Sequence, residues 1–168
     1  MGSIWTEPLE TLYVGLAAAK PSPAGVTAAA VSARLGMGLL IKTLEITARR
    51  DEAVRGLIEA ARGYSAILAE AADEDISGSP ERKRIEIPMK AARAAAAGLD
   101  LCSEAAGLVR GALAADVGVA GMMLGSAVRA IVLCVDSNAG DFQAEERREL
   151  VGLAGARVES IIGQVSKA

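Results

Sequence analysis

Carboxylates are the side chains of this 168-residue chain best suited to move protons, because the sequence contains no histidine. Histidine is the commonest general base, and its absence also removes every Ser–His or Cys–His nucleophile pair. Asp116 is the strongest candidate for a general base, since it lies between two apolar helical stretches where burial would make its carboxylate more basic. It could instead be the N-cap of the helix that follows, a position that aspartate favours.

Two further groups of charged residues suit ligand binding. Asp73 and Asp75 accept hydrogen bonds only, which suits N–H donors, and the alternative is a solvated helix end. Negative charge at a helix C-terminus opposes the macrodipole, so a further role is indicated. Arg49 and Arg50 could bind a carboxylate bidentately, although a basic pair near a helix C-terminus is stabilising without a ligand.

The turn after the first predicted helix offers backbone N–H groups to a ligand. Pro23 and Gly25 precede a helix start, and the hydroxyl of Thr27 lies beside the same N–H groups, which suit an anionic or carbonyl oxygen. The alternative is an ordinary helix start after prolines. Asn138 could hydrogen-bond a substrate, but Ser137–Gly140 is also typical of a plain turn.

Composition indicates which elements must position these residues. Apolar residues make up 52% of the chain, 35 residues are alanine, and only 2% are aromatic. Alanine favours helices, whereas the usual strand formers are sparse. We therefore predict an all-α, antiparallel bundle of about six helices in a single domain over residues 1–168.

Periodicity and capping residues give the expected helices. They run over about 7–19, 26–47, 52–75, 80–111, 117–135 and 142–165. The expected N-caps are Thr6, Asp51, Ser79 and Asp141. Pro88 should kink or split the fourth helix. Small residues over 25–38 mean that another backbone or a ligand comes close to the second helix.

Several classes of function are disfavoured. A net charge of −3 gives no field that gathers nucleic acid. Cys102 and Cys134 form no CxxC and are expected to be reduced core residues, so no metal is expected. Arg34 and Arg129 interrupt the most apolar stretches, and no signal peptide is recognisable, so we expect a cytoplasmic protein that does not enter a membrane.

The second and fifth predicted helices carry few charges on any side. We expect each to bury a face in a homodimer. The alternative is a very apolar monomeric core.

Four stretches, taken in chain order, resemble the cyclodeaminase/cyclohydrolase family. They are Leu9–Gly38, with a Pro-Ser-Pro turn before a helix of small residues; the acidic Ala72–Asp75 with Glu86–Met89; Ala115–Ala120; and Cys134–Asn138. The resemblance implies a helical, usually dimeric protein that binds a tetrahydrofolate derivative between helices.

The chain also departs from the family pattern. The family's glycine triplet is reduced to Ala24-Gly25-Val26, and the added Cβ atoms take up space where a ligand would approach the backbone. Ser77–Ser79 replaces a longer, aromatic-containing segment. Arg49 and Arg50 stand where the family has paired lysines, which keeps the charge but not the option of a neutral amine.

The resemblance implies hydrolysis of 5,10-methenyltetrahydrofolate to 10-formyltetrahydrofolate, or cyclodeamination of 5-formiminotetrahydrofolate. Asp116 would activate the water, Asp73 and Asp75 would bind the N–H groups of a pterin, and Arg49 and Arg50 would bind the glutamate tail. The alternative is a noncatalytic dimer that acts as a scaffold or binds a different pterin-like ligand.

Overall fold

A computed structural model describes residues 3–167, and helices joined by short turns make up this part of the chain. The elements are η1 (Ile4–Thr6), α1 (Leu9–Ala17), α2 (Gly25–Thr47), η2 (Glu52–Val54), α3 (Arg55–Ser77), α4 (Pro80–Arg84), α5 (Glu86–Leu108), α6 (Ala112–Ala139) and α7 (Ala144–Val165). No strand occurs within these residues. The all-α prediction is confirmed.

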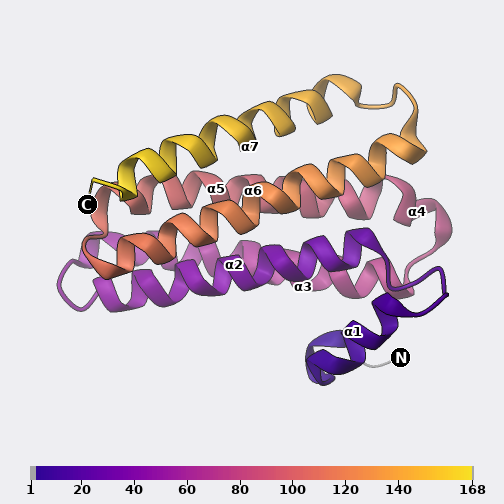
Figure 1. Cartoon of the computed structure of the whole chain (residues 1–168), viewed down its shortest axis with the longest axis horizontal. Coiled ribbons are helices and arrows are strands. Elements are labelled where there is room, and N and C mark those ends of the chain that lie inside the picture. The colour runs from indigo at the N-terminus through magenta and orange to yellow at the C-terminus, as the bar shows by residue number, and fades with distance from the viewer. Residues whose placement is uncertain (1–2, 168) are drawn as a thin grey trace.

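Four long helices, α2, α3, α5 and α6, pack around one core, and α7 covers the face formed by α5 and α6 (Figure 1). Short turns join successive long helices, so neighbours in sequence run antiparallel. Helices α2, α5 and α7 end where α3 and α6 begin, which gives the bundle two distinct ends. Helix α1 lies outside the bundle and buries none of its residues.

Small residues let α2 and α6 approach closely, as the sequence predicts. A Cβ added at Gly36 would lie 3.0 Å from Cβ of Met123 and 3.2 Å from the Ala120 carbonyl oxygen. Between these close contacts the core is filled by larger side chains, among them the fully buried Met37 and Leu124. Alanine and glycine therefore set the spacing of the helices, and a few long side chains fill the layers.

Two of the predicted helices differ most from the structure. The fourth predicted helix breaks at Ile85, whose φ is −139°, and Pro88 becomes the third residue of α5, where its missing N–H costs no intrahelical bond. Helix α6 begins at Ala112 rather than near 117, because Gly111 has a φ of +64° that directs the chain into the helix.

Two of the four predicted N-caps are confirmed. Asp51 accepts a bond from the Ala53 N–H and caps η2, and Ser79 caps α4. The other two are wrong: Thr6 ends η1 while Pro8 precedes α1, and Gln143, with a φ of +52°, precedes α7 in place of Asp141.

Helices α2 and α6 are long and apolar enough to cross a membrane by length and composition, which corrects the expectation from interrupting arginines. Half or more of the most apolar window in each helix is buried inside the bundle. Core helices of bundles pass the same test, so the packing gives these two helices an ordinary structural explanation.

Candidate functional site

The predicted site residues divide between the two ends of the bundle. We call the end with Gly25, Asp73 and Asp75 the acidic end, and the end with Arg49 and Arg50 the basic end. Lys42 lies 17 residues along α2 from Gly25, roughly 25 Å at about 1.5 Å per residue. The Asp116 carboxylate accepts a hydrogen bond from Lys42, so within one copy of the chain Asp116 does not lie beside Gly25 and the acidic end.

At the acidic end, Asp75 is bound by the protein itself. The side chain is buried, and its Oδ2 accepts hydrogen bonds from the Thr27 N–H (3.0 Å) and hydroxyl (2.6 Å). Ala24, the N-cap of α2, has no side-chain acceptor to offer. Asp75 therefore caps α2 from a neighbouring helix, which explains a negative charge at the C-terminus of α3.

Asp73 anchors the start of the chain. Its carboxylate accepts hydrogen bonds from the Ser3 hydroxyl at 2.6 Å and from the Ile4 N–H at 2.9 Å. The Trp5 indole N–H donates to the Ala69 carbonyl one turn earlier on α3, at 3.1 Å. These bonds hold η1 against α3.

The turn before α2 is closed by packing. A Cβ added at Gly25 would lie 3.0 Å from Sγ of Cys134 on α6, and Val26 is buried. Pro23 packs against Gly15 of α1 in the same way, at 3.2 Å from an added Cβ. The backbone that was expected to receive a ligand at Gly25 therefore faces α6.

Both cysteines are reduced, as expected. Burial raises the pKa of the Cys102 thiol to about 12. Burial and the negative charge of Asp75 both raise the pKa of the Cys134 thiol. Neither thiol is activated as a nucleophile.

Asn138 lies in the last turn of α6 rather than in a turn between helices. Its amide donates to the Cys134 carbonyl at 2.8 Å and to the Ser137 hydroxyl at 3.2 Å. Arg84 of α4 donates to the Asn138 carbonyl at 3.2 Å. The amide N–H groups of Asn138 are thus used in finishing the helix.

Nearer the basic end, Asp116 is held by a lysine. Its Oδ2 lies 2.6 Å from Nζ of Lys42, and 31% of the aspartate side chain is exposed. Asp116 is therefore only partly buried, although it lies between two apolar stretches of sequence. The N-cap alternative is wrong, because α6 begins four residues earlier. Among the contacts of residues 3–167, Oδ1 of Asp116 has no hydrogen-bond donor.

Lys42 was not a candidate from sequence. It is one of five lysines in the chain, and 74 residues separate it from Asp116. Only the packing of α2 against α6 brings the two together.

A groove of about 560 Å³ runs along α2 and has Lys42 in its lining. It is lined by Trp5, Arg34, Leu35, Gly38, Leu39, Lys42 and Ser65. A Cβ added at Gly38 would meet no heavy atom of residues 3–167 within 4 Å, so the groove floor is open there. The Arg34 guanidinium stacks 3.9 Å from the centre of the Trp5 ring, which makes one wall flat.

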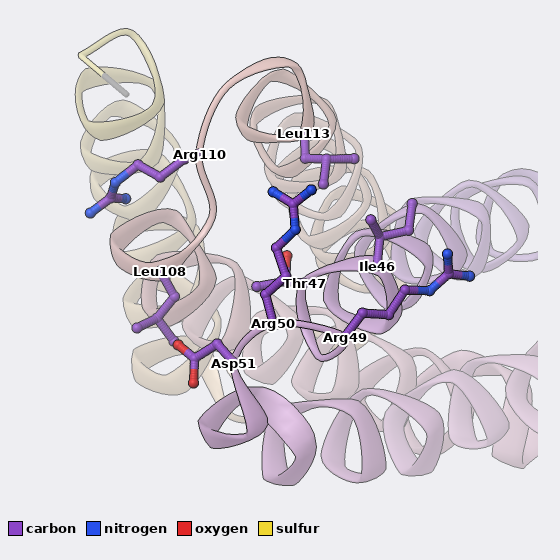
Figure 2. Close-up of a pocket in the computed structure, with 8 residues that line it drawn as sticks. All are labelled: Ile46, Thr47, Arg49, Arg50, Asp51, Leu108, Arg110 and Leu113. Atoms are coloured by element: carbon purple, nitrogen blue, oxygen red, sulfur yellow. The ribbon is translucent and has the colours of Figure 1, made fainter.

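A second cavity, of about 450 Å³, lies at the basic end (Figure 2). It is lined by Ile46, Thr47, Arg49, Arg50, Asp51, Leu108, Arg110 and Leu113. Ile46 follows Lys42 by four residues on α2, and Leu113 precedes Asp116 by three on α6. Such spacings place residues on the same helix face, so the cavity lies about one helical turn from the Lys42–Asp116 pair.

No group of histidine, cysteine, aspartate or glutamate suited to hold a metal ion occurs in the described part of the chain.

Two of the comparisons with known proteins find matches. A sequence model described as formiminotransferase-cyclodeaminase matches residues 81–152, which contain the Glu86–Met89 and Ala115–Ala120 motifs. The solved structure of formiminotetrahydrofolate cyclodeaminase from Thermotoga maritima has a TM-score of 0.79 and 16% identity to this chain, and the match covers 98% of this chain and 96% of that one. None of the curated proteins matches. The sequence match runs from α4 into the first part of α7, less than half of the chain, and the structural match shows that the chain shares the fold of that cyclodeaminase. Both findings agree with the resemblance that the sequence motifs indicated.

Proposed function

We propose that the protein is a folate one-carbon enzyme whose reacting centre is Asp116. The observation that carries the proposal is the state of this carboxylate: Lys42, which lines the open groove, holds Oδ2 at 2.6 Å, while no donor within residues 3–167 binds Oδ1. The family match supports a folate as substrate. A metal ion has no part in the mechanism that we propose.

For 5,10-methenyltetrahydrofolate, Oδ1 of Asp116 accepts a proton from a water molecule as the water oxygen bonds to the methenyl carbon. The bond from that carbon to N5 then breaks, Asp116 returns its proton to N5, and the hydroxyl of the adduct gives its remaining proton to solvent as it becomes the formyl carbonyl on N10. No electron acceptor is needed, because the carbon keeps its oxidation state. Lys42 is a positioning residue: its ammonium fixes one oxygen and leaves the other for the water.

For 5-formiminotetrahydrofolate, the same carboxylate would take the proton that N10 loses as N10 attacks the formimino carbon. The proton then passes to the departing nitrogen, and ammonia leaves. Both reactions ask one residue to accept a proton and return it, so the Lys42–Asp116 geometry serves either substrate.

The surfaces on either side of the pair suit the other parts of a folate. Gly38 leaves room for a flat bicyclic ring, and Trp5 offers it an aromatic wall. Arg49 and Arg50, on the opposite side of Lys42, would bind the glutamate carboxylates. Substrate contact by Pro23, Gly25, Thr27, Asp73, Asp75 and Asn138 stays an untested prediction, and we leave these residues out of the proposed site because protein contacts already occupy them.

We also propose a homodimer that works in the cytoplasm. The exposed sides of α2 and α6 carry Leu35, Val119 and Met122, each about half exposed. A second copy laid on this face would bury these side chains and add a wall to the groove. Sedimentation of the purified protein tests this, because a monomer at micromolar concentration would contradict it.

The first test follows the loss of methenyltetrahydrofolate absorbance against the spontaneous rate. We expect the protein to accelerate the loss, and Lys42→Gln to lower the rate less than Asp116→Asn because it removes only the positioning contact. The same variants assayed for ammonia release from 5-formiminotetrahydrofolate decide between the two reactions. Absence of both activities would contradict the proposal.

The packed acidic end favours a second candidate, a noncatalytic family member. Gly25 faces Cys134, and Val26 fills space where the family has glycine, so a ring has no place at that turn. A protein that binds folates without turnover would show a thermal shift with tetrahydrofolate and no acceleration of either reaction. These two results together would mean that the protein binds folates without catalysing either reaction.

A further inference from the structure

One arginine of the chain is partly buried without a hydrogen-bonding partner. Every other arginine is exposed, except Arg147, which is buried and lies 2.7 Å from the Asp136 carboxylate. Arg34 belongs to neither group: it stacks on Trp5, and within residues 3–167 the hydrogen bonds and ion pairs of arginine side chains all belong to other arginines. A guanidinium carries five N–H donors, so Arg34 keeps donors that the described part of the chain does not use.

Trp5 holds the guanidinium of Arg34 in place. The two groups lie 3.9 Å apart, measured from the guanidinium carbon to the centre of the ring. The indole is held in turn, because its N–H donates to the Ala69 carbonyl of α3 at 3.1 Å. A stacked guanidinium has its N–H donors at the edge of its plane, and Arg34 lines the groove, so a ligand in the groove can reach these donors.

The spacing of residues on α2 places Arg34 along the same groove as the proposed reacting centre. Arg34, Gly38 and Lys42 follow one another at intervals of four residues, which puts them on one face of the helix. Gly38 leaves the floor of the groove open midway, and Lys42 holds Asp116. A flat ring over Gly38 would therefore lie between Arg34 and the Lys42–Asp116 pair.

The polar side chains that line the groove are suited to bind hydrogen-bond acceptors. They are the guanidinium of Arg34, the ammonium of Lys42 and the hydroxyl of Ser65, and none of the described residues in the lining carries a carboxylate. Asp73 and Asp75, which could have accepted bonds from ring N–H groups, are engaged at the acidic end. This groove therefore suits the carbonyl edge of a ring better than its N–H groups.

We infer that Arg34 is a specificity-determining residue, whose guanidinium donates hydrogen bonds to a ring carbonyl oxygen, so that the groove selects a 4-oxopteridine ring over its 4-amino counterpart. The amino group offers a donor where Arg34 requires an acceptor, and a protonated aminopteridine would be repelled by Arg34 and Lys42. The inference rests on the proposed function in one respect, that a folate ring enters this groove, and it gives Arg34 no part in proton transfer.

Calorimetric titration of the full chain with folic acid and with aminopterin tests the inference. The two compounds share the glutamate tail and differ in one substituent, oxo or amino, at ring position 4. We expect folic acid to bind roughly tenfold or more tightly than aminopterin, the effect of one charge-assisted hydrogen bond. Trp5 is the only tryptophan of the chain, so a change in its emission, corrected for absorption by the ligand, places the ring in this groove.

Variants at Arg34 separate its donors from its charge. Arg34→Met removes every donor but keeps an unbranched side chain beside Trp5, and we expect the two dissociation constants to become nearly equal. Arg34→Lys keeps the charge without the planar group and should retain part of the preference. Arg129→Met is the matched control, because Arg129 is an exposed arginine that lines a different groove, between α6 and α7, and we expect it to keep the full preference.

Equal affinities of the parent for the two compounds would overturn the inference, and so would an unchanged preference in Arg34→Met. The ratio of affinities is the deciding quantity, because a variant that merely lost folded protein would bind less of both compounds. A parent that binds neither compound would overturn both this inference and the assignment of a folate ring to the groove. Turnover is measured separately, so a preference without acceleration of either reaction would contradict only the proposed reaction, and acceleration without a preference would contradict only the role of Arg34.

Discussion

The two ends of the bundle use their charged residues in opposite ways. At the acidic end, Asp75 is buried against Thr27 and Asp73 holds the start of the chain, so both carboxylates are engaged within the protein. Toward the basic end, Asp116 stays partly exposed and the arginines have no carboxylate partners in the described part of the chain. The difference teaches that a polar residue near a run of small residues does not by itself identify a binding site. Small residues can instead allow two helices to pack closely, as they do at the acidic end.

The largest effect on stability is expected at Asp75. Replacing it with alanine leaves the Thr27 donors at the start of α2 without an acceptor, and a buried unsatisfied group costs about 1–3 kcal/mol. Urea unfolding of Asp75→Ala should show this loss, whereas Asp141→Ala, an exposed aspartate at the same end, should stay within about 0.5 kcal/mol of the parent. Equal stability of the two variants would mean that Asp75 does not cap α2.

Two glycines on α2 should respond oppositely to alanine. At Gly36 the new Cβ would press on the Ala120 backbone, and overpacking costs about 1–3 kcal/mol. At Gly38 the Cβ enters the open groove, so alanine should stabilise the helix by up to about 1 kcal/mol. Thermal unfolding of both variants shows whether each glycine lies in a tight helix contact or faces the open groove. Destabilisation by Gly38→Ala would mean that the position is packed against other protein atoms.

The smallest effect is expected for the surface pair Arg93–Glu146. The guanidinium donates to both carboxylate oxygens at 2.6 and 2.9 Å, and this hydrogen bonding lowers the pKa of Glu146. A lowered pKa in the folded state stabilises the protein above the unfolded-state pKa and is lost as pH falls through the folded value. Glu146→Gln should therefore cost about 0.2–1 kcal/mol at neutral pH, and this cost should shrink as pH falls below the unfolded-state pKa of about 4.3.

Glu149→Gln, one turn further along α7, is the control for that pair, because Glu149 makes no ion pair in the described part of the chain. A pH-independent difference between Glu146→Gln and the parent would contradict the ion-pair explanation.

Much of the fold could be predicted from sequence, because helix content follows from composition and the long helices from periodicity. Helix boundaries were harder to predict where the backbone conformation of a single residue sets them. Gly111 sets the start of α6 because its φ is positive. Ile85 interrupts the helix three residues before Pro88, the residue that was expected to interrupt it. Neither conformation follows from a periodic pattern.

The candidate site was less predictable, because its contacts join residues far apart in the chain. Asp116 was recognisable as a lone acid between apolar stretches, but Lys42 becomes its partner only through helix packing. Arg110 could not be singled out from sequence, because only the fold brings it to the same cavity as Arg49 and Arg50, which follow a different helix. Asp75 gave a misleading signal, because a charge at the end of one helix serves the start of another.

The most direct test of the account compares matched variants of the two ends, Asp116→Asn and Asp75→Asn, by kcat/KM with methenyltetrahydrofolate and by thermal unfolding. The account predicts that Asp116→Asn lowers kcat/KM by about 100-fold or more with Tm nearly unchanged, the usual effect of losing a general base. It predicts that Asp75→Asn lowers Tm while the folded fraction keeps its kcat/KM. Full activity of Asp116→Asn, or loss of catalysis confined to Asp75→Asn, would contradict it and place the reacting centre at the acidic end.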